Sequence, residues 1–145
     1  MTDYDELDAR VHKILGDEDE QADIGDSVNR YIDHLVDSLQ LPCTVTGSED
    51  FNWEEFYVIG PGAPDAYERL RVNAPSYQDH FDLLSIEKDV ISEWMMFDED
   101  IVCHVRRQSD GKLFYLGLAE IEAVDKDSKN HQLLNDYAVW FVNNR

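Results

Sequence analysis

The residues most able to do chemistry in this sequence are carboxylates that gather in one short loop. Calcium takes six to eight oxygen ligands at roughly 2.3–2.6 Å, mostly from carboxylates and carbonyls, and tolerates flexible geometry. A loop that offers several acids within a few residues, with neutral side-chain oxygens nearby, meets this requirement. The sequence therefore predicts a calcium site in the segment 47–55, with these candidate ligands: Glu49, Asp50, Glu54 and Glu55.

Two shorter acidic clusters offer further ligands. Asp98 and Asp100 follow an apolar stretch, and Asp79 and Asp82 lie on either side of His80. Acids from separate loops can converge on one edge of a sheet, which would add these four carboxylates to the same calcium site. The alternative interpretation is that each cluster is a solvated loop that keeps a sheet edge soluble.

An EF-hand is not indicated. The best match to the EF-hand template covers residues 125–136, with acids at the first, third and last positions. Lys129 occupies the fifth position, and Asn130 replaces the glycine that makes the turn. Because a cation at a ligand position is electrostatically unfavourable, we interpret this segment as a charged loop before the last helix.

Catalytic motifs are missing from the sequence. The histidines have none of the spacings found in zinc-dependent hydrolases, and neither a G-x-S-x-G nor a P-loop pattern occurs. His104 follows Cys103 directly, so in a strand the two side chains point to opposite faces and form no Cys–His pair. Cys43 and Cys103 also lack metal-ligand spacing, and we interpret them as buried thiols. The sequence predicts a protein that is not an enzyme.

Net charge restricts the partners. The 145 residues include 32 acidic and 12 basic side chains, for a formal charge of -20. This charge repels nucleic-acid phosphates and anionic membranes, and it attracts cations and basic proteins. We therefore expect no direct binding to DNA, RNA or membranes. Because the sequence contains no bilayer-spanning apolar run and no secretory signal, we also expect a cytoplasmic protein.

Acidity of this degree also arises in two ways that do not involve calcium. Asp outnumbers Glu by 20 to 12 and only 5 lysines occur, a bias that high-salt organisms impose on proteins of every function. An acidic interaction protein, such as a decoy, an inhibitor or a nucleic-acid mimic that docks on a basic partner, would also carry this charge. The prediction of a calcium site therefore depends on how the acids cluster, and oligomeric state stays undetermined.

Two helices are predicted at the start of the chain. Apolar residues at helical spacing predict the first over residues 3–15, and Gly16 can end it. The second helix is capped by Asp26 or Ser27. The segment 17–26 between them has six acids and no base, which predicts an exposed, mobile linker.

Beyond residue 42 the apolar spacing changes toward two, which is typical of strands. The turn Ser109–Lys112 predicts a β-hairpin between the fourth strand and the apolar run after it. A short helix over residues 65–72 and a final helical segment complete the pattern, and residues 117–124 are either a strand or a turn of helix. The four strands before the hairpin turn are predicted at Cys43–Thr46, Phe56–Ile59, Phe81–Ile86 and Ile101–Arg106.

These elements predict an α+β fold. Two N-terminal helices lead into a small antiparallel sheet or an open SH3-like barrel, which a C-terminal helical segment follows. We divide the chain into an N-terminal helical segment with the acidic linker, residues 1–41, and an acidic α+β domain, residues 42–145.

Several stretches after residue 42 also resemble a known family. They include Asp50-Phe-Asn-Trp-Glu-Glu-Phe-Tyr-Val-Ile-Gly60, Phe81-Asp-Leu-Leu-Ser85 and the ending Gln132–Asn143. On these residues, the segment 43–145 resembles the small acidic calcium-binding proteins typified by the cyanobacterial protein CcbP. The resemblance implies calcium buffering or signalling through acidic surface loops rather than an EF-hand. Within its motifs the implied ligands are Asp50, Glu54 and Glu55, and the first 41 residues lie outside it.

Overall fold

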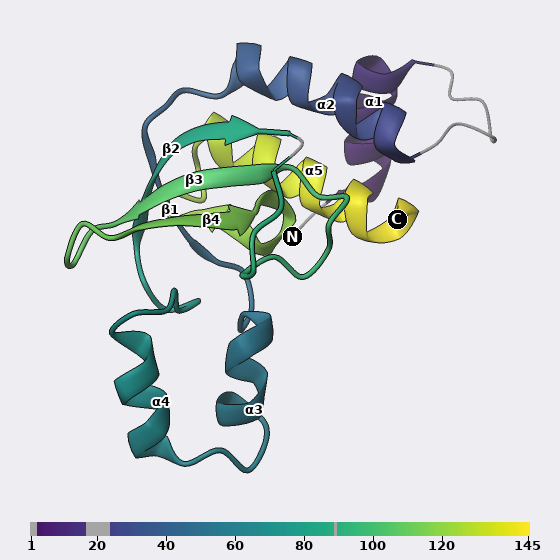
Figure 1. The fold of residues 1–145 in the computed structure, drawn as a ribbon. Helices are drawn as coiled ribbons and strands as arrows, with labels where there is room; N and C mark the ends of the chain where they lie inside the picture. The colour runs from purple at the N-terminus through teal and green to yellow at the C-terminus, as the bar shows by residue number, and fades with distance from the viewer. Residues whose placement is uncertain (1–2, 17–23, 89) are drawn as a thin grey trace.

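The computed structural model describes residues 3–16, 24–88 and 90–145. Most of the acidic linker predicted over residues 17–26 lies outside these ranges. Figure 1 shows the N-terminal helices and the last helix gathered on one side of the sheet, and two short helices projecting on the other side. No helix in the described ranges combines the length and the apolar character that a membrane crossing requires.

The first helix, α1, spans Tyr4–Leu15 and confirms the sequence prediction. The carboxylate of Asp3 caps it by accepting hydrogen bonds from the backbone N–H groups of Asp5 and Glu6, at 3.1 and 3.2 Å. Gly16 ends the helix with a φ of +72°, a conformation that favours glycine over residues with a side chain.

The second helix, α2, spans Ile24–Ser38 and begins earlier than predicted. The two predicted caps, Asp26 and Ser27, therefore lie within its first turn. Polar residues of this type occur in first helical turns as well as at caps, so composition alone did not distinguish the two positions.

In the part of the chain that the structure describes, five strands form one open antiparallel sheet in the order β4-β3-β2-β1-β5. The predicted hairpin joins β3 to β4. β1 lies between β2 and β5, so it contacts both the next strand in the sequence and the last one. The strands are β1 at Cys43–Gly47, β2 at Phe81–Glu87, β3 at Val102–Arg107, β4 at Leu113–Gly117 and β5 at Ile121–Ala123.

The strand predicted over Phe56–Ile59 is wrong. Residues 56–58 lie instead in the short helix α3 (Glu55–Val58), which continues a 3-10 helix, η1 (Asn52–Glu54), and Ile59 follows α3. Trp53 and Tyr57 are four residues apart, so a helix places both rings on one side. Aromatic and β-branched composition favours strands only where a neighbouring strand pairs with them, and β2 pairs with β1 and β3 instead.

The short helix α4 spans Pro64–Arg71, close to its prediction. The ring centroid of Tyr67 lies 5.7 Å from those of Trp53 and Tyr57, and these three rings form a small aromatic cluster between α3 and α4. We call η1, α3 and α4 together the arm, which Figure 1 shows projecting away from the sheet.

One apolar core joins the N-terminal helices to the sheet and to the last helix, α5 (Lys129–Asn144). Tyr31 of α2 and Tyr137 of α5 are fully buried, with ring centroids 5.0 Å apart. The guanidinium of Arg10 on α1 donates two hydrogen bonds, of 2.6 and 2.9 Å, to the carboxylate of Asp136 on α5. These contacts hold α1 and α2 against α5.

Arg107 connects the arm to the sheet. This β3 side chain is only 3% exposed, and its guanidinium donates to three backbone carbonyls within residues 71–74, at 2.7–3.0 Å. It also forms ion pairs with Asp79 at 3.1 Å and Asp110 at 2.7 Å. One buried cation therefore satisfies the carbonyls at the end of α4 and two carboxylates.

We expect Arg107→Ala to lower the free energy of unfolding by about 3–5 kcal/mol, because it leaves buried acceptors and carboxylates without their cation. Equilibrium urea unfolding measures this change. The control is Arg106→Ala, which removes a half-exposed ion pair with Asp82 and should cost less than about 1 kcal/mol. Equal losses in the two variants would contradict the role of Arg107.

Candidate functional site

A cavity of about 470 Å³ lies between α5 and the end of the sheet where β1 and β5 meet. Its walls come from the loop after β1, the 3-10 helix η2 (Leu118–Glu120), β5, α5 and the loop around Phe97. Segments more than 90 positions apart in the sequence, from Ser48 to Asn143, thus share one hollow.

Strand pairing brings two acidic stretches together at this cavity. β1 and β5 run antiparallel with Thr46 opposite Glu122. Two residues further along, the backbone N–H of Ser48 donates to the carbonyl of Glu120 at 2.9 Å. The acids of the following loop, residues 49–50, therefore lie beside those at the start of β5.

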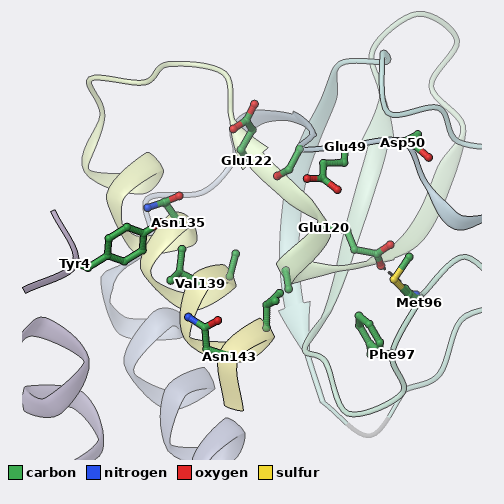
Figure 2. Close-up of a pocket in the computed structure, with 14 residues that line it drawn as sticks. Tyr4, Glu49, Asp50, Met96, Phe97, Glu120, Glu122, Asn135, Val139 and Asn143 are labelled. Carbon is green, nitrogen blue, oxygen red and sulfur yellow. Dashed lines mark hydrogen bonds between the residues drawn. The ribbon is translucent and has the colours of Figure 1, made fainter. Parts of the chain in front are cut away.

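Figure 2 shows the carboxylates on the sheet side of the cavity and the side chains of α5 on the opposite side. The α5 wall presents the amides of Asn135 and Asn143 and the apolar side chain of Val139. The hollow thus combines an acidic wall with a partly apolar one. Its carboxylates are Glu49, Asp50, Glu120 and Glu122.

Sequence reasoning missed Glu120 and Glu122, although a signal existed. The two acids alternate with Ile121, which is 1% exposed. If the segment were extended throughout, this spacing would put both acids on the face opposite the buried residue; in the structure only Glu122 lies in the strand, and Glu120 ends η2. Nothing local, however, indicates that this face lies next to the loop after β1.

Of the eight ligands predicted from the sequence, Glu49 and Asp50 line the cavity. The structure does not bring the other six to it. Glu55 lies exposed on α3, and Asp98 lies exposed in the loop before β3. The remaining predicted ligands have partners within the protein: Glu54, Asp79, Asp82 and Asp100.

Glu54 is fully buried, and its carboxylate accepts four hydrogen bonds. The backbone N–H groups of Phe51 and Tyr77 donate to Oε1 at 3.1 and 2.8 Å. The hydroxyls of Ser76 and Tyr67 donate to Oε2 at 2.8 and 2.6 Å. Burial, followed by this hydrogen bond to Glu54, raises the pKa of Tyr67 to about 12. Glu54 therefore holds the base of the arm and is not available to a metal ion.

Asp79 and Asp82 are paired with arginines. Asp79 contacts Arg107 at 3.1 Å, and Asp82 contacts Arg106 at 2.9 Å. The Asp82 carboxylate also accepts a hydrogen bond from Gln108 at 2.8 Å. The hydrogen bonds from Gln108 and then Arg106 lower the pKa of Asp82. A metal ion at either carboxylate would have to displace an arginine.

Asp100 is buried directly behind the cavity wall. Its carboxylate accepts hydrogen bonds from the hydroxyl of Tyr137 at 2.6 Å and the backbone N–H of Ala119 at 3.0 Å. Burial, with a smaller contribution from the charge of Glu120, raises the pKa of Asp100 to about 7. Burial also raises the pKa of Glu120. Both carboxylates approach the Cα of Gly117 so closely that any side chain there would collide with them.

The segment that best matched the EF-hand template is mostly helical. Ser128 caps α5 by accepting a hydrogen bond from the backbone N–H of His131, so residues 129–136 belong to the helix. The last acid of the template, Asp136, is buried against Arg10. The other two acids of the template, Asp125 and Asp127, lie in a turn before the helix.

The histidine and cysteine of β3 have structural surroundings. The ring of His104 stacks on that of Tyr115, with centroids 4.7 Å apart. The thiol of Cys103 donates to the carbonyl of Leu116 at 3.2 Å, and burial raises its pKa. A thiol with a raised pKa is a poor nucleophile.

The four cavity carboxylates are not arranged as a rigid metal centre. Across residues 3–16, 24–88 and 90–145, no three His, Cys, Asp or Glu side chains meet closely enough to hold a metal ion. Glu49 is exposed, and the other three are partly exposed. The cavity therefore offers four carboxylates that are spread around one hollow.

Comparison with known proteins identifies the fold. No protein-family model and no curated protein matches the chain. The crystal structure of CcbP from Anabaena aligns with a TM-score of 0.59 and 14% identity, over 97% of this chain and 93% of that one. A calcium binding protein in its calcium-binding form aligns with a TM-score of 0.56 and 16% identity, over 96% and 91%.

These likenesses show that the chain has a CcbP-like α+β fold, which confirms the predicted fold class. The alignment extends beyond residues 43–145, on which the sequence resemblance rested, into the N-terminal helices. This extent agrees with the core contacts that α1 and α2 make with α5.

We expect Glu54→Gln to lower the free energy of unfolding by at least about 2 kcal/mol, because the amide nitrogen faces buried donors that lose their acceptor. Chemical denaturation measures the loss. The control Glu55→Gln changes the exposed side chain next to Glu54. Its free energy of unfolding should stay within about 0.5 kcal/mol of the wild-type value. A Glu54 variant as stable as the control would show that the four hydrogen bonds are dispensable.

We expect Asp100→Asn to gain stability relative to the wild type as pH rises from 5 to 8. A pKa raised to about 7 from about 3.9 in the unfolded chain means that the folded wild type binds more protons between these values. The free energy of unfolding of the wild type therefore falls with rising pH, by up to about 1.4 kcal/mol per pH unit. Asp100→Asn has no carboxyl group at this position and lacks this pH dependence.

Denaturant unfolding at several pH values tests this prediction, with Asp98→Asn as the exposed control. The difference in stability between Asp100→Asn and the wild type should grow with pH, whereas that of the control should stay level. A constant difference for Asp100→Asn would mean that Asp100 ionises normally in the fold.

Proposed function

We propose that this chain binds calcium at the cavity between α5 and the sheet. The observation that carries the proposal is the pairing of β1 with β5, which collects acids from two distant stretches of sequence around one hollow. Carboxylates, the amide oxygen of Asn135 and water would together supply the six to eight oxygens that calcium takes. The proposed carboxylate ligands are Glu49, Asp50, Glu120 and Glu122.

These four carboxylates are like charges, which repel one another. Four negative groups surround one hollow, and no lysine or arginine is among the described residues that line it. A divalent cation offsets this repulsion and attracts all four side chains at once. Without an ion, the four carboxylates lie apart. We therefore infer that the side chains close around the ion when it binds.

The geometry favours calcium over magnesium. Magnesium requires a nearly ideal octahedral arrangement and gives up its water reluctantly, whereas calcium accepts irregular sites with more ligands. Two of the acids lie in a loop and two in a short 3-10 helix and strand, which offer no octahedral set. Acidic surface segments, rather than an EF-hand, would then hold the ion.

Likeness of fold supports the choice of ion. One solved structure that aligns with 96% of this chain is described as a calcium binding protein in its calcium-binding form. A role in buffering or signalling follows from reversible binding by surface carboxylates, and catalysis plays no part in the proposal.

Calorimetric titration with calcium at ~0.15 M salt tests the proposal. We expect measurable binding, with a dissociation constant of roughly 10⁻⁵ to 10⁻³ M for a surface site of this kind, and weaker binding of magnesium. The double variant Glu49→Gln with Glu122→Gln should bind calcium at least about tenfold more weakly, a loss of ~1.4 kcal/mol.

The matched control is Glu55→Gln with Glu68→Gln, which removes the same charge from exposed positions on the arm. Its calcium affinity should change by less than about twofold, since exposed charges at a distance are screened. An absence of binding in the wild type, or equal weakening in the two double variants, would overturn the proposed site.

A further inference from the structure

The cavity has an apolar wall that a calcium site does not require. Val139 and Val142 of α5 line it together with Met96 and Phe97 of the loop before β3. Val142 is 52% exposed and Met96 44% exposed. Tyr4, at the start of α1, lines the same hollow and is 61% exposed. Apolar side chains therefore continue from the cavity onto the open surface.

Among the described residues that line the cavity, no lysine or arginine compensates the charge of the acidic wall. An arginine or lysine from another molecule would find four carboxylates within the same cavity. The cavity is thus complementary to a ligand that carries both positive and apolar groups.

The chain itself shows the type of contact that this surface favours. The guanidinium of Arg145 lies 3.8 Å from the ring centroid of Phe97, at one side of the cavity. This is a cation–π arrangement, in which a positive group is attracted to the face of an aromatic ring. Arg145 occupies this face of Phe97, so it illustrates how a basic side chain contacts an aromatic ring beside the cavity.

We propose that the cavity is a docking site for a basic, amphipathic segment of a partner protein. Apolar residues of the segment pack on Val139, Val142 and Met96, and its lysines or arginines pair with Glu49, Glu120 and Glu122. A helix with apolar residues at positions i, i+3, i+4 and i+7 presents both kinds of side chain along adjacent faces.

A protein segment fits this surface better than the other classes of ligand. A small molecule is normally buried over most of its surface, whereas the apolar wall here continues into exposed side chains. Nucleic acids and anionic lipids carry phosphates, which the charge of -20 repels. Positive charge on the partner also speeds its association by long-range attraction.

Calcium and the segment exclude each other, a part of the inference that rests on the proposed calcium site. Both use the same carboxylates, and calcium neutralises the charge that attracts the basic residues. By linkage, each ligand must weaken the other by the same factor. The site would then release its partner when calcium rises.

A defined peptide tests the docking. The probe is a fluorescent peptide of about 14 residues with Leu at helical spacing and Lys elsewhere, measured by fluorescence anisotropy in a calcium chelator. A second peptide with Ser in place of every Leu has the same charge and reports non-specific attraction. We expect the Leu/Lys peptide to bind at least about tenfold more tightly than the Ser/Lys peptide.

Two valine variants locate the binding. Val142→Lys places a cation on the apolar wall, and Val36→Lys makes the same change on α2, where Val36 is 60% exposed and outside the cavity. We expect Val142→Lys to weaken the Leu/Lys peptide at least about tenfold and Val36→Lys less than about twofold. Thermal melts verify that both variants fold.

Equal affinity for the two peptides, or equal effects of the two valine variants, would overturn the docking site. The double variant Glu49→Gln with Glu122→Gln gives an independent check, because it should also weaken the peptide, and the Glu55 and Glu68 control should not. If the glutamate variant binds the peptide normally, the cavity carboxylates do not hold the segment.

Calcium is then added to the complex of the wild type with the peptide. We expect the peptide affinity to fall at least about tenfold at saturating calcium. If calorimetry detects calcium but the peptide affinity stays constant, mutual exclusion is wrong. If calcium does not bind at all, the proposed calcium site fails, whereas the result in chelator still decides the docking of the peptide.

Discussion

The pairing of β1 with β5 is the constraint on which the candidate site depends. β5 has only 3 residues, and its register places Gly47 opposite Ile121. A side chain at Gly47 is excluded, because its Cβ would lie 2.6 Å from the Cα of Tyr77. Tyr77 is held in turn by the hydrogen bond from its backbone N–H to the buried carboxylate of Glu54. The buried carboxylate of Glu54 thereby positions the loop that carries Glu49 and Asp50.

The carboxylates of this protein divide by the number of donors that surround them. Glu54 and Asp136 are buried because several N–H and O–H groups or an arginine stabilise their charge. Asp100 is buried with neither the four donors of Glu54 nor the arginine of Asp136, and it lies close to Glu120, so its pKa rises. The cavity acids have partial access to water and few donors, which leaves their charge available to a ligand from outside.

The cavity unites a negative wall with an apolar one, and this combination restricts what can bind there. Negative charge alone attracts any cation, and in a chain of charge -20 such attraction acts over the whole surface. The apolar side chains of α5 add a requirement of shape and hydrophobicity that a simple ion does not use. Selective binding at this cavity would therefore depend on the position of α5 next to β5, which contacts between these elements maintain.

The sequence by itself determined the helices α1, α4 and α5, the β3–β4 hairpin and the acidic loop at Glu49 and Asp50, because each depends on local spacing or local composition. It misplaced the start of α2, and it assigned a strand to residues 56–59 because aromatic composition does not reveal whether a neighbouring strand is present. Only the tertiary structure decided which acids share a site: it buried Glu54 and joined Glu120 to the loop after β1. Strand pairing between distant segments and the burial of a side chain depend on the packing of the whole chain, which spacing within one segment does not contain.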